Sequence, residues 1–157
     1  MATASRYLFL ASGILWLLVG VLTPLLMDRG IGKAALFVTS TTDTALYGDA
    51  PEAILESTPA LVTFRGVTLR VIAGLLVAAG SLVIALSWFG LKPATAWALA
   101  ALSFVGVAVI PYWWIAFRPY REAGVAMSLL DIPPFMWVPA FLMPLAAALG
   151  WIAYAGN

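Results

Sequence analysis

Apolar residues fill four long stretches of the chain, and polar residues gather between them. The stretches cover about residues 7–27, 67–89, 94–117 and 132–154, and no stretch has a charged residue in its middle. A transmembrane helix needs about 20 mostly apolar residues to cross a hydrocarbon core of about 30 Å. Backbone polar groups inside lipid must be paired within the chain, so each stretch is expected to be helical. The pattern predicts an all-α integral membrane protein with four transmembrane helices in a single bundle.

Prolines and one acid mark where these helices begin and bend. Pro59 suits the first turn of a helix that starts outside the membrane and leads into the second span. Asp131 is the expected N-cap of the fourth span. Pro111 interrupts the third span, and Pro139 and Pro144 interrupt the fourth. We therefore predict a kink in the third span and a bent or locally unwound helix in the fourth, with the freed carbonyls paired to neighbouring groups.

The chain is expected to form one membrane domain, residues 1–157, in which the longer connection, residues 28–64, carries short helical or interfacial segments. Four spans place both termini on the same side of the cell membrane. The short link at residues 90–95 predicts that the second and third helices are antiparallel neighbours. More basic residues lie on the loop side, which taken literally puts the loops in the cytoplasm. Because those loops are much longer, their basic residues are no denser, and we expect cytoplasmic termini.

Composition and charge exclude several classes of protein. The chain is 64% hydrophobic and 10% charged, and its mean hydropathy is +1.03, whereas a soluble domain carries about 25% charged residues. The net charge of +1 gives no reason to expect nucleic-acid binding. The absence of Cys and His from the sequence removes the usual ligands of zinc, haem and iron–sulfur clusters, so no metal or cofactor is predicted. The acids between Asp43 and Glu56 indicate a helix start near Asp49 rather than a calcium site.

Enzymatic and transport signatures are missing from the sequence. The spans have no ionisable residue at their centres, which argues against coupled ion or proton transport. The sequence also lacks the Gly-x-Ser-x-Gly and Ser-x-x-Lys nucleophile motifs and a phosphate-binding glycine loop. Acid–base chemistry on Asp, Glu or Tyr stays open. Because the nucleophile and phosphate-binding motifs are missing, we expect a protein without catalytic activity.

Residues with binding chemistry gather at the loop side of the membrane. Aromatic side chains there suit the headgroup level, and arginine binds phosphate or carboxylate in a fork geometry. Two interpretations are open: an anchoring aromatic belt, or a headgroup-level pocket whose arginines face a lipid phosphate or an anionic amphiphile. The candidate ligand-binding residues are Arg65, Arg70, Trp113, Trp114, Arg118, Arg121, Glu122, Asp131 and Trp137.

Two functional hypotheses follow. The first is a non-catalytic accessory, assembly or structural subunit of a membrane complex or homo-oligomer, with lipids and other membrane subunits, or itself, as partners. It depends mainly on the missing enzymatic and transport signatures. The sequence also has small residues that allow close helix contacts, namely Gly13, Gly20, Gly74, Ala78, Ser81, Ala98, Ala101, Gly106, Ala146 and Gly150. The alternative is a binder, carrier or enzyme for a lipophilic molecule such as a lipid, quinone or pigment. Its pocket would open between the third and fourth spans beside Trp113, Trp114, Met136, Trp137, Phe141 and Met143.

Overall fold

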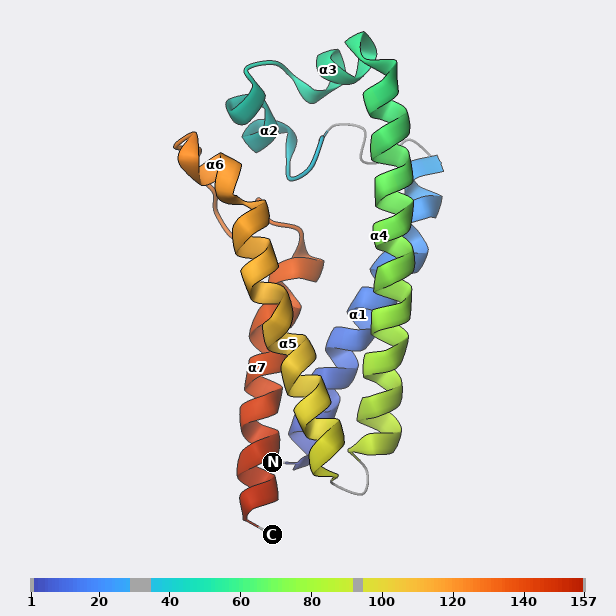
Figure 1. Ribbon diagram of the computed structural model, residues 1–157, viewed down its shortest axis with the longest axis vertical. Coiled ribbons are helices and arrows are strands. Elements are labelled where there is room, and N and C mark those ends of the chain that lie inside the picture. The colour runs from blue at the N-terminus through green and yellow to red at the C-terminus, as the bar shows by residue number, and fades with distance from the viewer. Residues whose placement is uncertain (1, 29–34, 92–94, 157) are drawn as a thin grey trace.

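The computed structural model describes residues 2–28, 35–91 and 95–156, and the regular elements in these segments are all helices (Figure 1). Four of the helical segments are long and apolar enough to cross a membrane, which confirms the predicted fold class. The elements are α1 (Ala2–Asp28), α2 (Ser40–Tyr47), α3 (Pro51–Ser57), α4 (Pro59–Ala85), the π-helical turn η1 (Leu86–Gly90), α5 (Ala96–Ala116), α6 (Arg118–Glu122) and α7 (Pro134–Ala155). Both termini lie at one end of the bundle, and α2, α3 and α6 lie at the other (Figure 1).

The start of the fourth span differs from its prediction. Its N-cap is Pro133, and Asp131 instead accepts hydrogen bonds within the preceding loop, so the predicted Asp131 cap is wrong. Of the two alternatives for Pro139, a bend or local unwinding, the structure shows no unwinding, because the helix continues through this residue. Proline lacks the N–H that would pair with the carbonyl of Phe135. The indole Nε1 of Trp16 in α1 donates to that carbonyl at 2.9 Å, which satisfies it without a break in α7.

The spanning helices pack in the order α4, α1, α7, α5. The most extensive contacts join α1 to α4, α1 to α7, and α5 to α7. A buried bond from Ser5 Oγ to the carbonyl of Ala146, 2.6 Å long, holds α1 against α7. The short link does make α4 and α5 antiparallel, but α5 meets the second span mainly at η1, and the two helices diverge toward the loop end (Figure 1). Packing against α1, rather than connection length, therefore decides the neighbour of α4.

Close backbone approach explains why α4 pairs with α1. A Cβ added to Gly80 would lie 2.6 Å from the backbone nitrogen of Leu17 and 2.7 Å from the carbonyl oxygen of Gly13. A Cβ added to Gly20 would lie 2.6 Å from the carbonyl oxygen of Ala73. Only glycine permits such contacts, which are typical of membrane helix pairs without large side chains between them. The small residues of the first span therefore pack within this chain.

The loop end has a hydrophobic cluster of its own. Its buried members are Val38 before α2, Phe117 at the N-cap of α6, Tyr120 within α6, and Met136 in α7. The ring of Phe37 also contacts that of Phe117, with centroids 6.2 Å apart. These contacts join two connections that are far apart in the sequence. They fix the layer of short helices on the end of the bundle.

Candidate functional site

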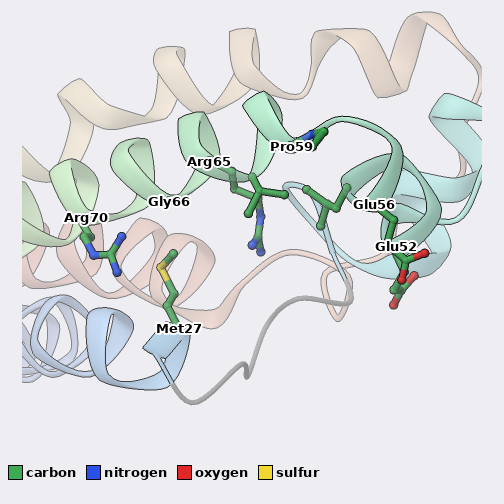
Figure 2. Close-up of a pocket in the computed structure, with 9 residues that line it drawn as sticks. Met27, Glu52, Glu56, Pro59, Arg65, Gly66 and Arg70 are labelled. Atoms are coloured by element: carbon green, nitrogen blue, oxygen red, sulfur yellow. The ribbon is translucent and has the colours of Figure 1, made fainter.

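An open cavity of about 650 Å³ lies at the loop end, between α3, the first turns of α4 and the end of α1 (Figure 2). We call it the interfacial cavity. Apolar atoms and four charged side chains share its lining, which consists of Met27, Glu52, Leu55, Glu56, Pro59, Val62, Arg65, Gly66 and Arg70. Its lining carries charges of both signs.

Two prolines set the walls of this cavity. Pro51 and Pro59 each occupy the first turn of a helix, and the single residue Thr58 separates α3 from α4. Thr58 has φ −132° and ψ 78°, so the chain leaves α3 and turns before α4 begins. The residue before a proline avoids the helical conformation for steric reasons. The sequence therefore places α3 at an angle to α4 and leaves their charged faces on either side of a hollow.

Helical spacing explains which side chains line the two walls. Glu52 and Glu56 are four residues apart and share one face of α3, while Val62, Gly66 and Arg70 repeat at the same spacing along α4. Residues four apart lie one above the other on a helix. The absence of a side chain at Gly66 leaves room between its two neighbours on that face.

The length of the second span places the arginines near the headgroup level. The continuous helical segment Pro59–Gly90 has 32 residues, or about 48 Å at about 1.5 Å per residue. Because about 20 residues cross the hydrocarbon, counting back from Gly90 puts Arg70 at its edge and Arg65 about 7 Å further out. We therefore expect this end of α4 to meet lipid headgroups.

The charges within the interfacial cavity are separated by sign. Glu52 and Glu56 lie together at the α3 end, whereas Arg70 lies toward Met27 at the α1 end, with Arg65 between them (Figure 2). Arg70 and both glutamates are exposed, and Arg65 is half-buried. The Nε of Arg65 donates to the carbonyl of Leu36 at 3.4 Å. In the described lining, arginines thus lie at one end and glutamates at the other above apolar side chains, and the charge of Arg65 also interacts with that of Asp43.

A second, largely apolar cavity of about 300 Å³ shares Arg65 with the interfacial cavity. Its other lining residues come from α4, from the ends of α2 and α3, and from the segment before α2. They are Leu36, Phe37, Tyr47, Ile54, Leu61, Phe64, Thr68, Leu69 and Ile72. Such a lining suits hydrocarbon rather than a charged group.

The four candidate arginines line two separate hollows. Arg65 and Arg70 belong to the interfacial cavity. Arg118 and Arg121 line a shallow groove of about 440 Å³ on the outside of α5 and α6, together with Trp114, Ile115 and Glu122. The structure therefore divides the residues that the sequence grouped into one pocket.

Local partners hold the charged residues of that groove. Arg118 Nε and Glu122 Oε1 form an exposed ion pair at 2.6 Å. Arg121 Nη1 donates to the carbonyl of Trp114 at 2.8 Å, and its guanidinium carbon lies 3.7 Å from the centre of the Trp114 ring. Exposed pairs of this kind contribute little to stability, but they do fix side-chain direction.

The remaining candidates lie elsewhere. Trp113 packs against the loop-end cluster, and Trp137 makes an edge contact with Phe141, with ring centroids 6.5 Å apart. Asp131 accepts bonds from the backbone N–H and the hydroxyl of Ser128, both 2.8 Å long. Both bonds favour the ionised carboxylate and so hold the pKa of Asp131 below its usual value, and the bond from the backbone N–H has the larger effect. Asp131 thus shapes its own loop.

The structure also reveals that one of the described acids of the longer connection, Asp43, differs from the others in being buried. Asp43 is completely buried. Its Oδ2 accepts backbone N–H bonds from Leu36 at 2.6 Å and Phe37 at 2.9 Å, and its Oδ1 accepts from Val38 N–H at 3.4 Å and Tyr120 Oη–H at 2.7 Å. We call this arrangement the Asp43 clamp. A buried carboxylate requires such donors to offset the loss of water.

The sequence contains a partial signal for the clamp. Thr39 and Thr42 form a capping box at the start of α2, so a helix beginning there is readable from the hydroxyl run. Nothing in the sequence distinguishes Asp43 from the exposed acids that follow, because its main side-chain partner, Tyr120, is 77 residues away. Because this partner is distant in the sequence, only the tertiary structure identifies Asp43 as the buried acid.

Comparison with known proteins gave no match. Neither a protein-family model, nor a curated protein, nor a solved structure is similar to this chain. The four spanning helices show a multi-pass membrane protein.

Proposed function

We propose that this multi-pass membrane protein binds an amphiphilic, lipid-like molecule in the interfacial cavity. The observation that carries the proposal is a cavity of about 650 Å³ that combines two arginines with an apolar floor at the end of a spanning helix. A phosphate or other anionic headgroup would face Arg65 and Arg70. Arginine suits this role because its guanidinium is always charged and donates hydrogen bonds in a fork geometry.

The neighbouring apolar cavity supplies a place for hydrocarbon. It extends along α4 from Leu61 to Ile72, so its inner end lies beyond Arg65 toward the apolar part of the span. An amphiphile whose headgroup lies beside Arg65 would therefore find polar contacts on one side of α4 and apolar contacts on the other. This arrangement differs from the pocket expected between the third and fourth spans, and it supports a binding role on the second span instead.

The test measures lipid retention by the full chain. Wild-type protein in nanodiscs containing equal amounts of dioleoyl phosphatidylethanolamine and dioleoyl phosphatidylglycerol is released into mild detergent, and retained phospholipid is counted by native mass spectrometry. We expect about one retained lipid in the wild type and a loss of about five- to tenfold in Arg70→Gln, the equivalent of about 1–1.4 kcal/mol. Arg70→Lys keeps the charge and should retain more lipid than Arg70→Gln.

A second variant tests the outer groove as a rival site. Arg118→Gln removes one charge from the groove and leaves the interfacial cavity unchanged. Equal retention in wild type and Arg70→Gln would overturn the proposal. A larger loss in Arg118→Gln than in Arg70→Gln would also overturn it, because the lipid would then bind at the groove.

An assembly role is the second candidate, and the outward face of α4 favours it. Only 17% of the most apolar window of the second span is buried within the chain, and a Cβ added to Gly74 would contact nothing within 4 Å. Small exposed residues allow another helix to approach closely. If this face joins another copy or another subunit, Gly74→Leu should lower the mass of the complex in mild detergent. An unchanged mass would count against it.

A further inference from the structure

We propose that the interfacial cavity selects a zwitterionic headgroup that carries a primary ammonium as well as a phosphate. This inference rests on the proposed function and adds the class of ligand. The phosphate lies at the Arg65 and Arg70 end, and the ammonium lies at the Glu52 and Glu56 end of the same cavity. A phosphoethanolamine group has this chemistry, whether it belongs to a phospholipid or to a soluble molecule.

The separation of charges is the first argument. Glu52 and Glu56 come from α3, Arg65 and Arg70 come from α4, and all four line one hollow (Figure 2). A purely anionic headgroup would gain attraction from the arginines and meet repulsion from the two carboxylates. A headgroup with both charges matches both regions, since complementary charge favours the partner whose pattern fits.

The position of the two glutamates is the second argument. They are four residues apart on one exposed face of α3, and like charges at this spacing repel each other on a helix. An ammonium group between them would reverse that repulsion. A primary ammonium has three N–H donors, so it can bond to two carboxylates at once.

The apolar part of the lining distinguishes a primary ammonium from a quaternary one. The nine described lining residues include no aromatic ring; the uncharged members are Met27, Leu55, Pro59, Val62 and Gly66. Quaternary ammonium groups have no N–H donor, and proteins recognise them with cages of aromatic side chains. The cavity therefore favours phosphoethanolamine over phosphocholine.

The experiment compares three lipids with the same chains. Full-length protein is placed in nanodiscs with equal amounts of dioleoyl phosphatidylethanolamine, phosphatidylcholine and phosphatidylglycerol, and the retained species are identified by native mass spectrometry. We expect phosphatidylethanolamine to exceed each of the other two by about fivefold, which corresponds to a partly exposed charge pair. The double variant Glu52→Gln/Glu56→Gln should lose this preference and retain phosphatidylglycerol at least as well as the wild type.

A matched control removes a carboxylate outside the cavity. Asp49 is exposed and precedes α3, and it does not line the interfacial cavity. Asp49→Asn should therefore keep the preference for phosphatidylethanolamine. An equal loss of preference in this variant would show that overall charge, rather than the cavity, sets the selectivity, and would overturn the inference.

The outcomes separate this inference from the proposed function. If wild type and Arg70→Gln retain the same total phospholipid, the proposed function fails. Two other results are that total retention depends on Arg70 while phosphatidylglycerol or phosphatidylcholine is the preferred lipid, or while the glutamate double variant keeps the wild-type preference. Either result would overturn the inference of a zwitterionic headgroup and leave the proposed lipid binding in place.

A competition arm distinguishes a lipid from a soluble source. If soluble glycerophosphoethanolamine does not displace the retained phosphatidylethanolamine, the ligand is the membrane lipid. Displacement at equal concentration supports a soluble zwitterion with the same headgroup chemistry.

Discussion

Replacing Tyr120 by phenylalanine removes one hydroxyl group from the Asp43 clamp and leaves the ring in place. The lost bond joins Tyr120 Oη to Asp43 Oδ1 at 2.7 Å. After the substitution, Oδ1 keeps only the 3.4 Å bond from the N–H of Val38. The N–H groups of Leu36 and Phe37 still donate to Oδ2 of Asp43. The buried carboxylate, however, now has one strong hydrogen-bond donor fewer.

The magnitude follows from the kind of bond that is lost. A hydrogen bond to a charged group contributes about 1.5–3 kcal/mol, and an underbonded buried acceptor costs a similar amount. Each 1.4 kcal/mol corresponds to about a tenfold change in an equilibrium constant. The local opening of the loop end should therefore become about ten- to a hundredfold more frequent in Tyr120→Phe.

Hydrogen exchange on the full chain in detergent measures this opening directly. The N–H groups of Leu36, Phe37 and Val38 are the backbone donors of the clamp, so their protection should fall by that factor. Tyr112→Phe is the matched control, because Tyr112 is 73% exposed on α5. Unchanged protection in Tyr120→Phe, or an equal fall in Tyr112→Phe, would refute the reasoning.

Three further predictions concern the bundle and the pH dependence of the clamp. Trp16→Phe should lower the free energy of unfolding in detergent by about 1–2 kcal/mol. The loss should be smaller in a Pro139→Ala background, because the N–H of the alanine at position 139 can then bond to the carbonyl of Phe135. If the effects of the two substitutions simply add, the indole does not have this role. Gly80→Ala should cost about 1–3 kcal/mol because α1 and α4 must separate, whereas Gly74→Ala should be neutral or stabilising; equal melting shifts would argue against the close contact. Burial first, and then the bond to the carboxylate, raise the pKa of Tyr120 above its ordinary 10.0. The clamp is therefore stable below about pH 10 and weakens as the pH rises further, and an absorbance titration should show one of the five tyrosines resisting ionisation.

The apolar pattern determined the fold class by itself. Four apolar runs of about 20 residues must be helical in lipid, since no other local structure pairs nearly every backbone group within the segment. The starts of α3 and α4 were also readable, because Pro51 and Pro59 suit a first helical turn and cannot continue a preceding helix. The aromatic and basic character of the loop end followed from the same pattern, and so did Arg65 and Arg70 as candidates.

Tertiary structure decided how these elements meet. The short link between the second and third spans does not show that α4 pairs with α1, because the decisive contact is between the backbones at Gly13 and Gly80, 67 positions apart. Likewise, the carbonyl of Phe135, which Pro139 leaves without a backbone donor, accepts its hydrogen bond from Trp16 in another helix. The division of the arginines between two hollows and the burial of Asp43 also arise from long-range contacts. The physical reason is common to all of these features: periodicity fixes each helix and its apolar face, but which surfaces touch depends on shape and on hydrogen-bond partners distant in the sequence.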